Sequence, residues 1–517
     1  MSKSIYLINP RPDAPTYFGA EAYAAYGFAP AVYLADVVLV TVAAVIPSGF
    51  DVRICDEQIS PVDFDMPADF VGITGKINQE RRMIELAREF RRRGKIVIFG
   101  GCRASLSPDR LGPECDILVR GEIENIADRL FGDLQRGTWQ REYLGDKPDL
   151  RKLPLPRWDL YPNHRALLAS MQTSRGCPFE CEFCEVAQYL GRTPRHKEPG
   201  HVIAELDELY RYGYRLVFLC DDNFTAFRVR AKELLAALRD WNDARTQGRV
   251  SFSAQISADC ARDPGLLRLC SDAGLNYAFV GIETPNQASL KEAGKRQNLG
   301  DIAAQVEMLL AHGIMVTGGM MVGFDADTKD IFEQQYELSM TIPVPIFTAT
   351  PLAARMATPL FARLQKENRL AEDCPEASGV LPCVTNIVPA RMTLPELMAG
   401  LRWLCNRLYR PEAFCERVLR LIDRIVLPAP RANSSGPNAA LQPRPIDVEC
   451  AAVTGRVLRL GAAEAAAMAR IGQRLKEKPW ATPYVRSAVG SYVQIRHIYQ
   501  STGIWDAALG AQTRPQW

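Results

Sequence analysis

Two stretches of this 517-residue chain alternate short apolar strands with helices, and this alternation limits the folds that the chain can adopt. The pattern runs through residues 1–140 and again through residues 167–370. Strands that alternate with helices form parallel sheets, because each helix returns the chain to the edge where the next strand begins. We therefore predict an α/β protein with two parallel sheets. Ligands of such sheets bind at the carboxyl ends of the strands.

The first stretch predicts an open, doubly wound sheet with helices on both faces. Its expected strands are residues 4–9, 51–56, 70–74, 95–99 and 116–120, and its expected helices are 79–93 and 124–134. Three segments follow these strands at the expected ligand edge: Asp56-Glu57-Gln58, Thr74-Gly75-Lys76 and Gly100-Gly101-Cys102. Glycines at this edge would let the backbone approach a large flat ligand closely.

The second stretch has the spacing of a partial barrel built from six strand–helix units. Its expected strands are 167–172, 215–220, 250–257, 277–283, 314–323 and 346–352, and its helices lie near 199–212, 227–245, 263–273, 300–312 and 329–341. The later part of the chain predicts helices at 394–408, 412–425, 451–476 and 483–499. We expect four segments: a doubly wound domain (1–145), a proline-containing linker (146–166), the partial barrel (167–374) and a helical C-terminal domain (375–517).

Three cysteines, Cys177, Cys181 and Cys184, follow the first expected barrel strand. Gly176 and Pro178 turn this segment into a loop, and three thiolates on one loop suit an iron–sulfur cluster because soft sulfur ligands favour iron. Three cysteines leave one iron of a four-iron cluster open for another ligand. The alternatives are unrelated buried cysteines or a structural zinc site, but zinc normally takes four protein ligands and no nearby histidine completes such a set.

The order Cys-x-x-x-Cys-x-Phe-Cys, with Phe183 before the last cysteine, is the motif of the radical S-adenosylmethionine (SAM) superfamily, which the chain resembles. The resemblance implies a [4Fe–4S] cluster held by Cys177, Cys181 and Cys184, with SAM chelated by the open iron. The reduced cluster then cleaves SAM to a 5′-deoxyadenosyl radical. An external electron donor such as flavodoxin or ferredoxin would reduce the cluster.

Polar and glycine residues at the barrel strand ends are the expected SAM contacts. Residues 221–223 stand where many family members have a Gly-Gly-Glu run at the SAM amine, although the same residues suit a cap of the next helix. Gly281-Ile282-Glu283 resembles the ribose contact, and one of Lys291, Lys295 and Arg296 would pair with the SAM carboxylate. The expected set is Phe183, Asp221, Asp222, Asn223, Gln255, Ser257, Glu283, Arg296, Gly318 and Gly319.

A doubly wound domain before such a barrel resembles the cobalamin-binding domain of the B12-dependent radical SAM class. Many cobalamin domains carry an Asp-x-His-x-x-Gly loop whose histidine ligates cobalt. Here the corresponding loop is Asp56-Glu57-Gln58-Ile59-Ser60, and His164 is the first histidine of the chain, so the sequence excludes such a ligand from this domain. The class often lacks that histidine, and both a cobalamin-bound and a vacant domain remain open. The expected cobalamin contacts are Asp56, Thr74, Gly75, Gly100 and Gly101.

The resemblance extends along nearly the whole chain to hopanoid C-methylase-like proteins. It implies a radical SAM enzyme that methylates an unactivated carbon through methylcobalamin. With a vacant first domain, the reaction would instead be ring closure, carbon–carbon coupling or an unusual SAM cleavage such as aminocarboxypropyl transfer. A non-catalytic sensor is the third possibility, but a sensor would not need the full set of SAM motifs. The substrate would be a small molecule or a lipid.

Charge and cysteine content indicate the cellular setting. The net charge is +2, which gives no sign of a nucleic-acid partner. Met1-Ser2-Lys3 leads into a strand without a signal pattern, and 14 cysteines favour a reducing cytoplasm. The apolar segment 29–47 approaches membrane-span length, but its alanines and Asp36 favour a buried helix. We expect a cytoplasmic enzyme without a transmembrane segment.

Overall fold

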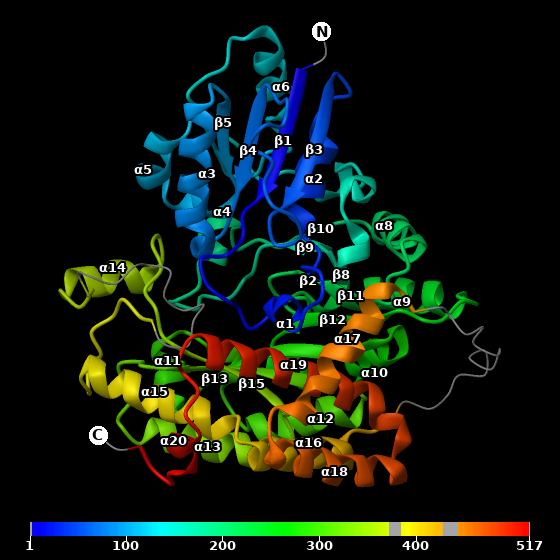
Figure 1. Ribbon diagram of the computed structural model, residues 1–517, viewed down its shortest axis with the longest axis vertical. Helices are drawn as coiled ribbons and strands as arrows, with labels where there is room; N and C mark the ends of the chain where they lie inside the picture. The colour runs from blue at the N-terminus through cyan, green and yellow to red at the C-terminus, as the bar shows by residue number, and fades with distance from the viewer. Residues whose placement is uncertain (1–2, 372–383, 428–442, 516–517) are drawn as a thin grey trace.

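The computed structural model describes residues 3–371, 384–427 and 443–515. The first domain, the barrel and the helical tail follow one another along the long axis of the molecule (Figure 1). The strands of the first sheet point their carboxyl ends toward the barrel. The ligand edge of the first sheet therefore faces the second parallel sheet of the protein.

The first domain contains the predicted parallel sheet. Its strands have the order β3 (Phe50–Asp56), β1 (Lys3–Asn9), β4 (Phe70–Thr74), β5 (Ile96–Gly100), β6 (Ile117–Arg120) and β7 (Glu142–Leu144). This is a doubly wound order, in which the direction of winding reverses between β1 and β4. The short strand β7 was not predicted, and it extends the sheet at the end of the first domain.

Helices cover both faces of this sheet because successive side chains of each strand point in opposite directions. Tyr6 and Ile8 of β1 face α3 (Glu80–Arg92), whereas Ile5 and Leu7 face α2 (Val37–Val45) and α6 (Ala127–Arg136). Two short helices, α4 (Gly101–Leu106) and α5 (Pro108–Leu111), follow β5. The two apolar clusters confirm the predicted doubly wound architecture.

The barrel is a seven-stranded parallel sheet that confirms the six predicted strands and adds one. The order is β15 (Ile346–Pro351), β14 (Met315–Val322), β13 (Leu275–Glu283), β12 (Ser251–Ile256), β11 (Leu216–Leu219), β8 (Ala166–Met171) and β2 (Val32–Leu34). The five predicted helices are α8 (Pro199–Arg211), α9 (Arg228–Asp243), α10 (Pro264–Ala273), α12 (Ile302–Ala311) and α13 (Ile331–Thr341). The shorter helix α11 (Gln287–Glu292) follows β13.

The added strand β2 comes from the first domain, within the segment expected to form one buried helix. Val32 and Leu34 pair with Ala166 and Leu168, so β2 completes the edge of the barrel sheet at β8. An unpaired strand edge exposes backbone donors and acceptors, which β2 satisfies here. Asp36 then ends the extended segment and caps α2 by accepting a 2.9 Å hydrogen bond from the Leu39 backbone N–H.

The chain after β15 is helical, as predicted, and most of its helices pack against the amino ends of the barrel strands, whereas the first of them lies beside the cysteine loop. They are α14 (Pro359–Lys366), α15 (Leu394–Leu408), α16 (Pro411–Arg424), α17 (Pro445–Gly455), α18 (Ala462–Glu477), α19 (Thr482–Ser501) and α20 (Ala507–Ala511). The expected helix 451–476 is two helices, which are separated near Gly461. No helix in the described part of the chain is long and apolar enough to cross a membrane.

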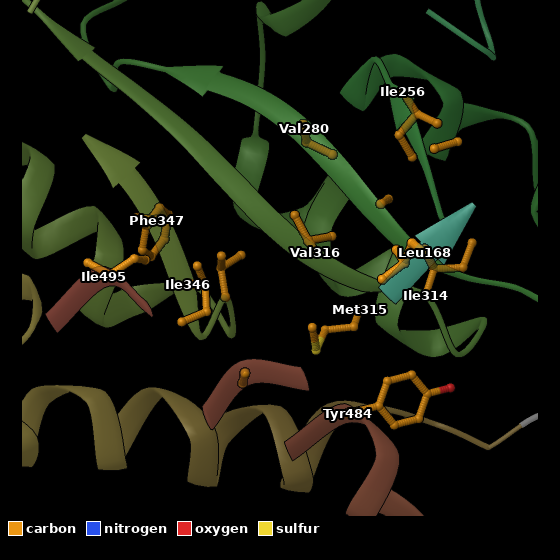
Figure 2. Packing of buried hydrophobic residues seen from close by; sticks show 14 of the residues in the cluster. Leu168, Ile256, Val280, Ile314, Met315, Val316, Ile346, Phe347, Tyr484 and Ile495 are labelled. Atoms are coloured by element: carbon orange, nitrogen blue, oxygen red, sulfur yellow. The ribbon is translucent and has the colours of Figure 1, made fainter. Parts of the chain in front are cut away.

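Tyrosines of the tail close one end of the barrel. The Tyr484 hydroxyl donates to the backbone oxygen of Gly313, just before β14, and the Tyr409 hydroxyl donates to that of Phe347 in β15. Figure 2 shows Tyr484 and Ile495 of α19 near the sheet residues with which they share one buried cluster. The tail therefore covers the amino ends of the strands, and the carboxyl ends face the first domain.

Candidate active site

The three cysteines lie on a loop between β9 (Ser174–Arg175) and α7 (Val186–Tyr189), and all three are half-buried. Burial raises the pKa of the Cys184 thiol to about 12, and charge repulsion from the neighbouring Cys181 and Cys177 contributes to this rise. Within the described ranges, no group of three or more His, Cys, Asp or Glu side chains could bind a single metal ion. Three thiolates on one loop suit a four-iron cluster, in which each cysteine would bind a different iron.

Asp221 holds the chain immediately before this loop. It follows β11, it is buried, and its Oδ1 accepts hydrogen bonds from the backbone N–H groups of Thr173 (2.6 Å) and Ser174 (2.9 Å). Its Oδ2 accepts a further bond from the Thr173 hydroxyl. The carboxylate oxygens that were expected at the SAM amine are thus engaged by the protein itself.

Asp222 also contacts the cysteine loop. Its Oδ2 accepts one hydrogen bond, from the Gly176 backbone N–H at 2.8 Å. Burial raises the pKa of this carboxyl to about 6, and the Gly176 contact partly opposes the rise. Asn223 accepts a 3.2 Å bond from the Thr225 backbone N–H. None of these residues caps the next helix, because α9 begins after Phe227, which makes no side-chain cap. The helix-cap alternative was therefore wrong.

Glu283 ends β13 in a strained backbone conformation. Its φ of 65° lies in the left-handed region that side chains rarely adopt, and the register with β14 shifts beside it. The Gln335 side chain donates to the Glu283 backbone oxygen at 2.7 Å, and Asn298 donates to that of Ile282 at 3.0 Å. Such strain persists where the surroundings enforce it, and it is common at functional sites.

Lys295 links Glu283 to the cysteine loop. Its Nζ donates to Glu283 Oε1 at 2.5 Å and lies 5.9 Å from the centre of the Phe183 ring. Burial lowers the pKa of Lys295, but Glu283 and Cys181 more than offset that effect, so that the pKa is raised overall. The other two basic candidates, Lys291 and Arg296, are exposed. The structure thus brings Lys295 into the site and leaves Arg296 outside it.

Phe183 packs against protein rather than presenting a free face. Its ring meets Phe324 edge-to-face at 6.3 Å, in a small apolar cluster that also contains Leu360 of α14. Arg363 of α14 ties the same helix to the loop, since its Nε donates to Glu182 Oε1 at 2.7 Å. No sequence pattern indicated that α14 covers the cysteine loop.

The glycines of β14 have a packing role. A Cβ on Gly318 would lie 2.7 Å from the Phe347 ring, and one on Gly319 would lie 3.0 Å from that of Phe279. Gly319 pairs with Gly281, and neither side chain fills the inner face of the sheet, the face opposite the barrel helices. A Cβ on Gly281 would lie 2.4 Å from Glu283 Oε1 and 2.8 Å from Lys295 Nζ, so glycine here lets both side chains lie close to the sheet.

An aromatic pair that was not predicted lies beside Gly319. Phe18, on the segment before α1 (Glu21–Ala25), meets Phe279 edge-to-face at 5.8 Å and is 47% exposed. Gln255 is exposed and lies beside Phe279 in register, whereas Ser257 is buried just beyond β12. Phe18 lies outside any periodic pattern, so the sequence could not connect it with the barrel.

The first domain contains a cavity of about 190 Å³ between its sheet and α2. The lining is mostly aliphatic, and it includes three of the expected contact residues, Thr74, Gly100 and Gly101. Glu122 and Arg175 also line the cavity, and Arg175 belongs to the barrel domain. The cavity therefore opens from the ligand edge of the first sheet toward the cysteine loop.

Two expected contact residues do not line this cavity. Asp56 is buried, and its Oδ2 accepts a 2.8 Å bond from the Tyr161 hydroxyl of the linker. Burial raises the pKa of Asp56 to about 6, with Asp36 adding to the rise. Gly75 is buried, and a Cβ there would lie 2.6 Å from the sulfur of Met83. Both residues serve the packing of the domain.

Comparison with known proteins assigns the family. The radical SAM superfamily matches residues 171–338, and a domain of unknown function (DUF4070) matches residues 358–467. A hopanoid C-2 methylase of Rhodopseudomonas palustris is 33% identical over 390 residues, which cover 73% of this chain and 72% of the relative. The chain belongs to the radical SAM superfamily. An uncharacterised methyltransferase of Synechocystis is 32% identical over 409 residues, covering 77% of this chain and 75% of the relative.

Solved structures show the same fold over nearly the whole chain. The cobalamin-dependent radical SAM enzyme OxsB, with aqua-cobalamin and SAM bound, has a TM-score of 0.61 at 13% identity and covers 97% of this chain and 80% of its own. The radical SAM methyltransferase TsrM of Kitasatospora setae, with cobalamin and a [4Fe–4S] cluster bound, has a TM-score of 0.58 at 16% identity and covers 93% and 100%. This radical SAM enzyme thus shares the architecture of both.

Proposed function

We propose that this radical SAM enzyme is a cobalamin-dependent methyltransferase that acts on an unactivated carbon. The observation that carries the proposal is the cavity of the first domain, which opens toward the cysteine loop of the barrel. Relatives and structural neighbours named methyltransferases support the same reaction class. The cluster and SAM would supply the radical, and cobalamin the methyl group.

The residues at the cavity suit cobalamin in the first domain. Aliphatic side chains of β1, β4 and α2 line its inner part, while Thr74 and Gln172 provide polar groups that suit the amide side chains of the corrin. The position beside the switch between β1 and β4 is where doubly wound sheets bind ligands. No histidine precedes His164, so we expect cobalamin to bind with its own base displaced and no protein histidine on cobalt.

The residues beside the cysteine loop suit SAM. The Lys295 ammonium is placed to pair with the SAM carboxylate, and Glu283 is suited to hydrogen-bond the two ribose hydroxyls. Asp222 has one described hydrogen bond, to Gly176, and is available for the SAM amine. Because all three lie near one another at the strand ends, they would hold SAM against the open iron.

We place the substrate beside Glu283, at the carboxyl ends of the barrel strands where such sheets bind ligands. Phe18 and Phe279 give this site an aromatic wall, and Gln255 offers one polar group. An apolar substrate, such as a lipid of the hopanoid class suggested by one relative, fits this wall. We place the enzyme in the cytoplasm, where an external donor such as flavodoxin or ferredoxin would reduce the cluster and no nucleic acid would be involved.

Ring closure is the second candidate. An anaerobic magnesium-protoporphyrin IX monomethyl ester cyclase of Cereibacter sphaeroides is 24% identical over 346 residues, which cover 61% of this chain and 55% of the relative. In that case the radical site would be used without a methyl transfer. The two candidates differ in the SAM-derived products that they release.

Product analysis tests the proposal. The anaerobically purified, reconstituted enzyme is supplied with reductant, cobalamin, SAM carrying a labelled methyl group, and diploptene as a hopanoid probe. A methyltransferase should release 5′-deoxyadenosine and S-adenosylhomocysteine in nearly equal amounts and place the label on carbon. Deoxyadenosine without S-adenosylhomocysteine would favour ring closure or coupling, and methylthioadenosine would indicate aminocarboxypropyl transfer.

A further inference from the structure

Four charged side chains, which are 3% to 16% exposed, connect the first domain with the cysteine loop. Glu122 and Glu124 follow β6 of the first domain, whereas Arg175 and Arg195 belong to the two-stranded ladder of β9 and β10 (Arg195–His196) in the barrel domain. Arg175 lies 2.6 Å from Glu122 and 2.7 Å from Glu124, and Arg195 lies 2.6 Å from Glu122. The side chains of Glu122 and Glu124 are only 3% and 5% exposed.

Each end of this network lies at a cofactor site. Glu122, Glu124 and Arg175 line the cavity of the first domain. Arg175 also precedes Cys177 by two positions, and the intervening Gly176 is bound by Asp222. The chain from the cavity wall to the first cluster cysteine is therefore short and fixed at several points.

The backbone that carries Glu122 has little freedom. Gly121 has a φ of 75°, and a Cβ there would lie 2.1 Å from the backbone oxygen of Gly145. The Gly121 N–H donates to the Ser105 hydroxyl at 2.9 Å. On the other side, Arg195 also donates to the backbone oxygen of Pro148 at 3.0 Å. Because the backbone is held on both sides, the ion pairs permit one placement of the cysteine loop relative to the first domain.

Buried ion pairs of this kind contribute more to the placement of the cysteine loop relative to the first domain than to the net stability of the protein. Two carboxylates and two guanidinium groups give no net charge, but taking all four out of water is costly. Apolar residues of similar volume often stabilise such a site as well or better. Removing one partner leaves a buried charge without compensation, so the geometry of the network is strongly enforced. A network of this kind at a domain boundary suits the exact alignment of two sites.

We propose that Glu122 is a positioning residue that aligns the cysteine loop with the first-domain cavity, so that ligand binding in the cavity and assembly of the cluster reinforce each other. The part that concerns cobalamin rests on the proposed function. An assembled cluster would hold Cys177 in place and so restrict Arg175 further, and Arg175 fixes one wall of the cavity through Glu122. By thermodynamic linkage, cobalamin must then favour the cluster-bound loop by the same factor.

The first test compares Glu122→Gln with Glu142→Gln, a matched control that removes a carboxylate from an exposed pair with Arg120 in the same domain. Hydroxocobalamin affinity is measured by optical titration of full-length protein with and without the assembled cluster. In the wild-type protein and in the control, we expect the cluster to tighten binding about tenfold, within the usual range of coupling between sites. In Glu122→Gln the ratio should fall to about one.

A second measurement does not depend on cobalamin. The reduced, SAM-bound cluster of cobalamin-free protein is examined by electron paramagnetic resonance, and iron content and circular dichroism establish that each variant is loaded and folded. We expect altered g-values in Glu122→Gln and unchanged values in Glu142→Gln. Arg195→Gln, which removes one arm and leaves the Glu122–Arg175 pair, should give a smaller change and serves if Glu122→Gln does not fold.

The outcomes distinguish the positioning role of Glu122 from the cobalamin binding of the proposed function. A wild-type affinity ratio of one, or the same tenfold ratio in Glu122→Gln as in the wild type, would overturn the coupling. Unchanged spectra in both network variants would overturn the positioning role. Failure of the wild-type protein to bind hydroxocobalamin would reject the cobalamin part of the proposed function, and the spectra would then decide the positioning role alone.

Discussion

Replacement of Asp221 by alanine tests whether this carboxylate holds the cysteine loop, as the structure indicates, or binds the SAM amine, as the sequence predicted. The carboxylate is 2% exposed and accepts three hydrogen bonds, two of them from backbone N–H groups of Thr173 and Ser174. If this contact holds the start of the cysteine loop, its loss should loosen the cluster. If Asp221 served SAM instead, the cluster would keep its stability and only SAM affinity would fall.

The size of the effect follows from the bonds that are lost. Each buried N–H group left without a partner costs about 1–3 kcal/mol, so the two backbone groups together cost about 2–6 kcal/mol. The lower limit corresponds to an increase of about 30-fold in the opened population of the loop. Asp221→Asn keeps one acceptor oxygen and should show a smaller effect.

The assay is the rate at which an excess of chelator removes iron from the reconstituted enzyme under anaerobic conditions. We expect this rate to rise about 30-fold or more in Asp221→Ala. Asp259→Ala is the control, because Asp259 also follows a barrel strand but forms a partly exposed pair with Arg228, which contributes about 1 kcal/mol or less. A rate within threefold of the wild-type value in Asp221→Ala, with weakened SAM binding, would refute the reasoning.

Three further predictions concern the cluster, SAM and pH. Replacing Cys177, Cys181 and Cys184 together by alanine should remove cluster iron and abolish formation of 5′-deoxyadenosine; retention of about four irons with continued SAM cleavage would contradict the assignment. Glu283→Ala should weaken SAM binding by about 30- to 150-fold, or 2–3 kcal/mol, at unchanged iron content, and equilibrium binding that matches the wild type would reject the ribose contact. Burial raises the pKa of Asp56 from 3.8 to about 6. Between these two pH values the folded protein keeps a proton that the unfolded chain loses. The free energy of unfolding therefore falls by up to about 3 kcal/mol as the pH rises from about 4 to 6. Asp56→Asn should therefore raise the melting temperature relative to wild type more at pH 7.5 than at pH 4.5; a difference that does not change with pH would disprove the buried charge.

The sequence predicted the long elements because their patterns are local. Apolar runs that end in glycine or polar residues identified β4 and the six main barrel strands, and the period of 3.6 residues identified the barrel helices. The strands β2 and β7 have three residues each, which is too short for a periodic signal. Their pairing depends on which sheet edge is free, and that is a property of the tertiary structure.

In the site, too, residues in short motifs could be predicted, whereas contacts between residues far apart in the sequence could not. The cysteines and Glu283 could be selected because each stands in a short motif with a defined spacing. Thr173 lies 48 positions from Asp221 along the chain, and Glu122 lies 53 positions from Arg175. Phe18 reaches Phe279 through a segment without regular structure. Motifs thus predicted the type of chemistry, but they could not show that the Asp221 carboxylate is bound by the protein itself.

Strand β2 also constrains the order in which this chain can fold during synthesis. Val32 pairs with Ala166, so the ribosome makes β2 long before its only strand neighbour in the described structure exists. The first sheet can form early, but the segment that carries β2 and Phe18 must wait unpaired until β8 emerges. Such a late, non-local pairing is slow and leaves an exposed edge in the meantime. The barrel produced as a separate fragment from residue 146 would lack this strand, and supplying residues 20–36 as a peptide should improve its recovery.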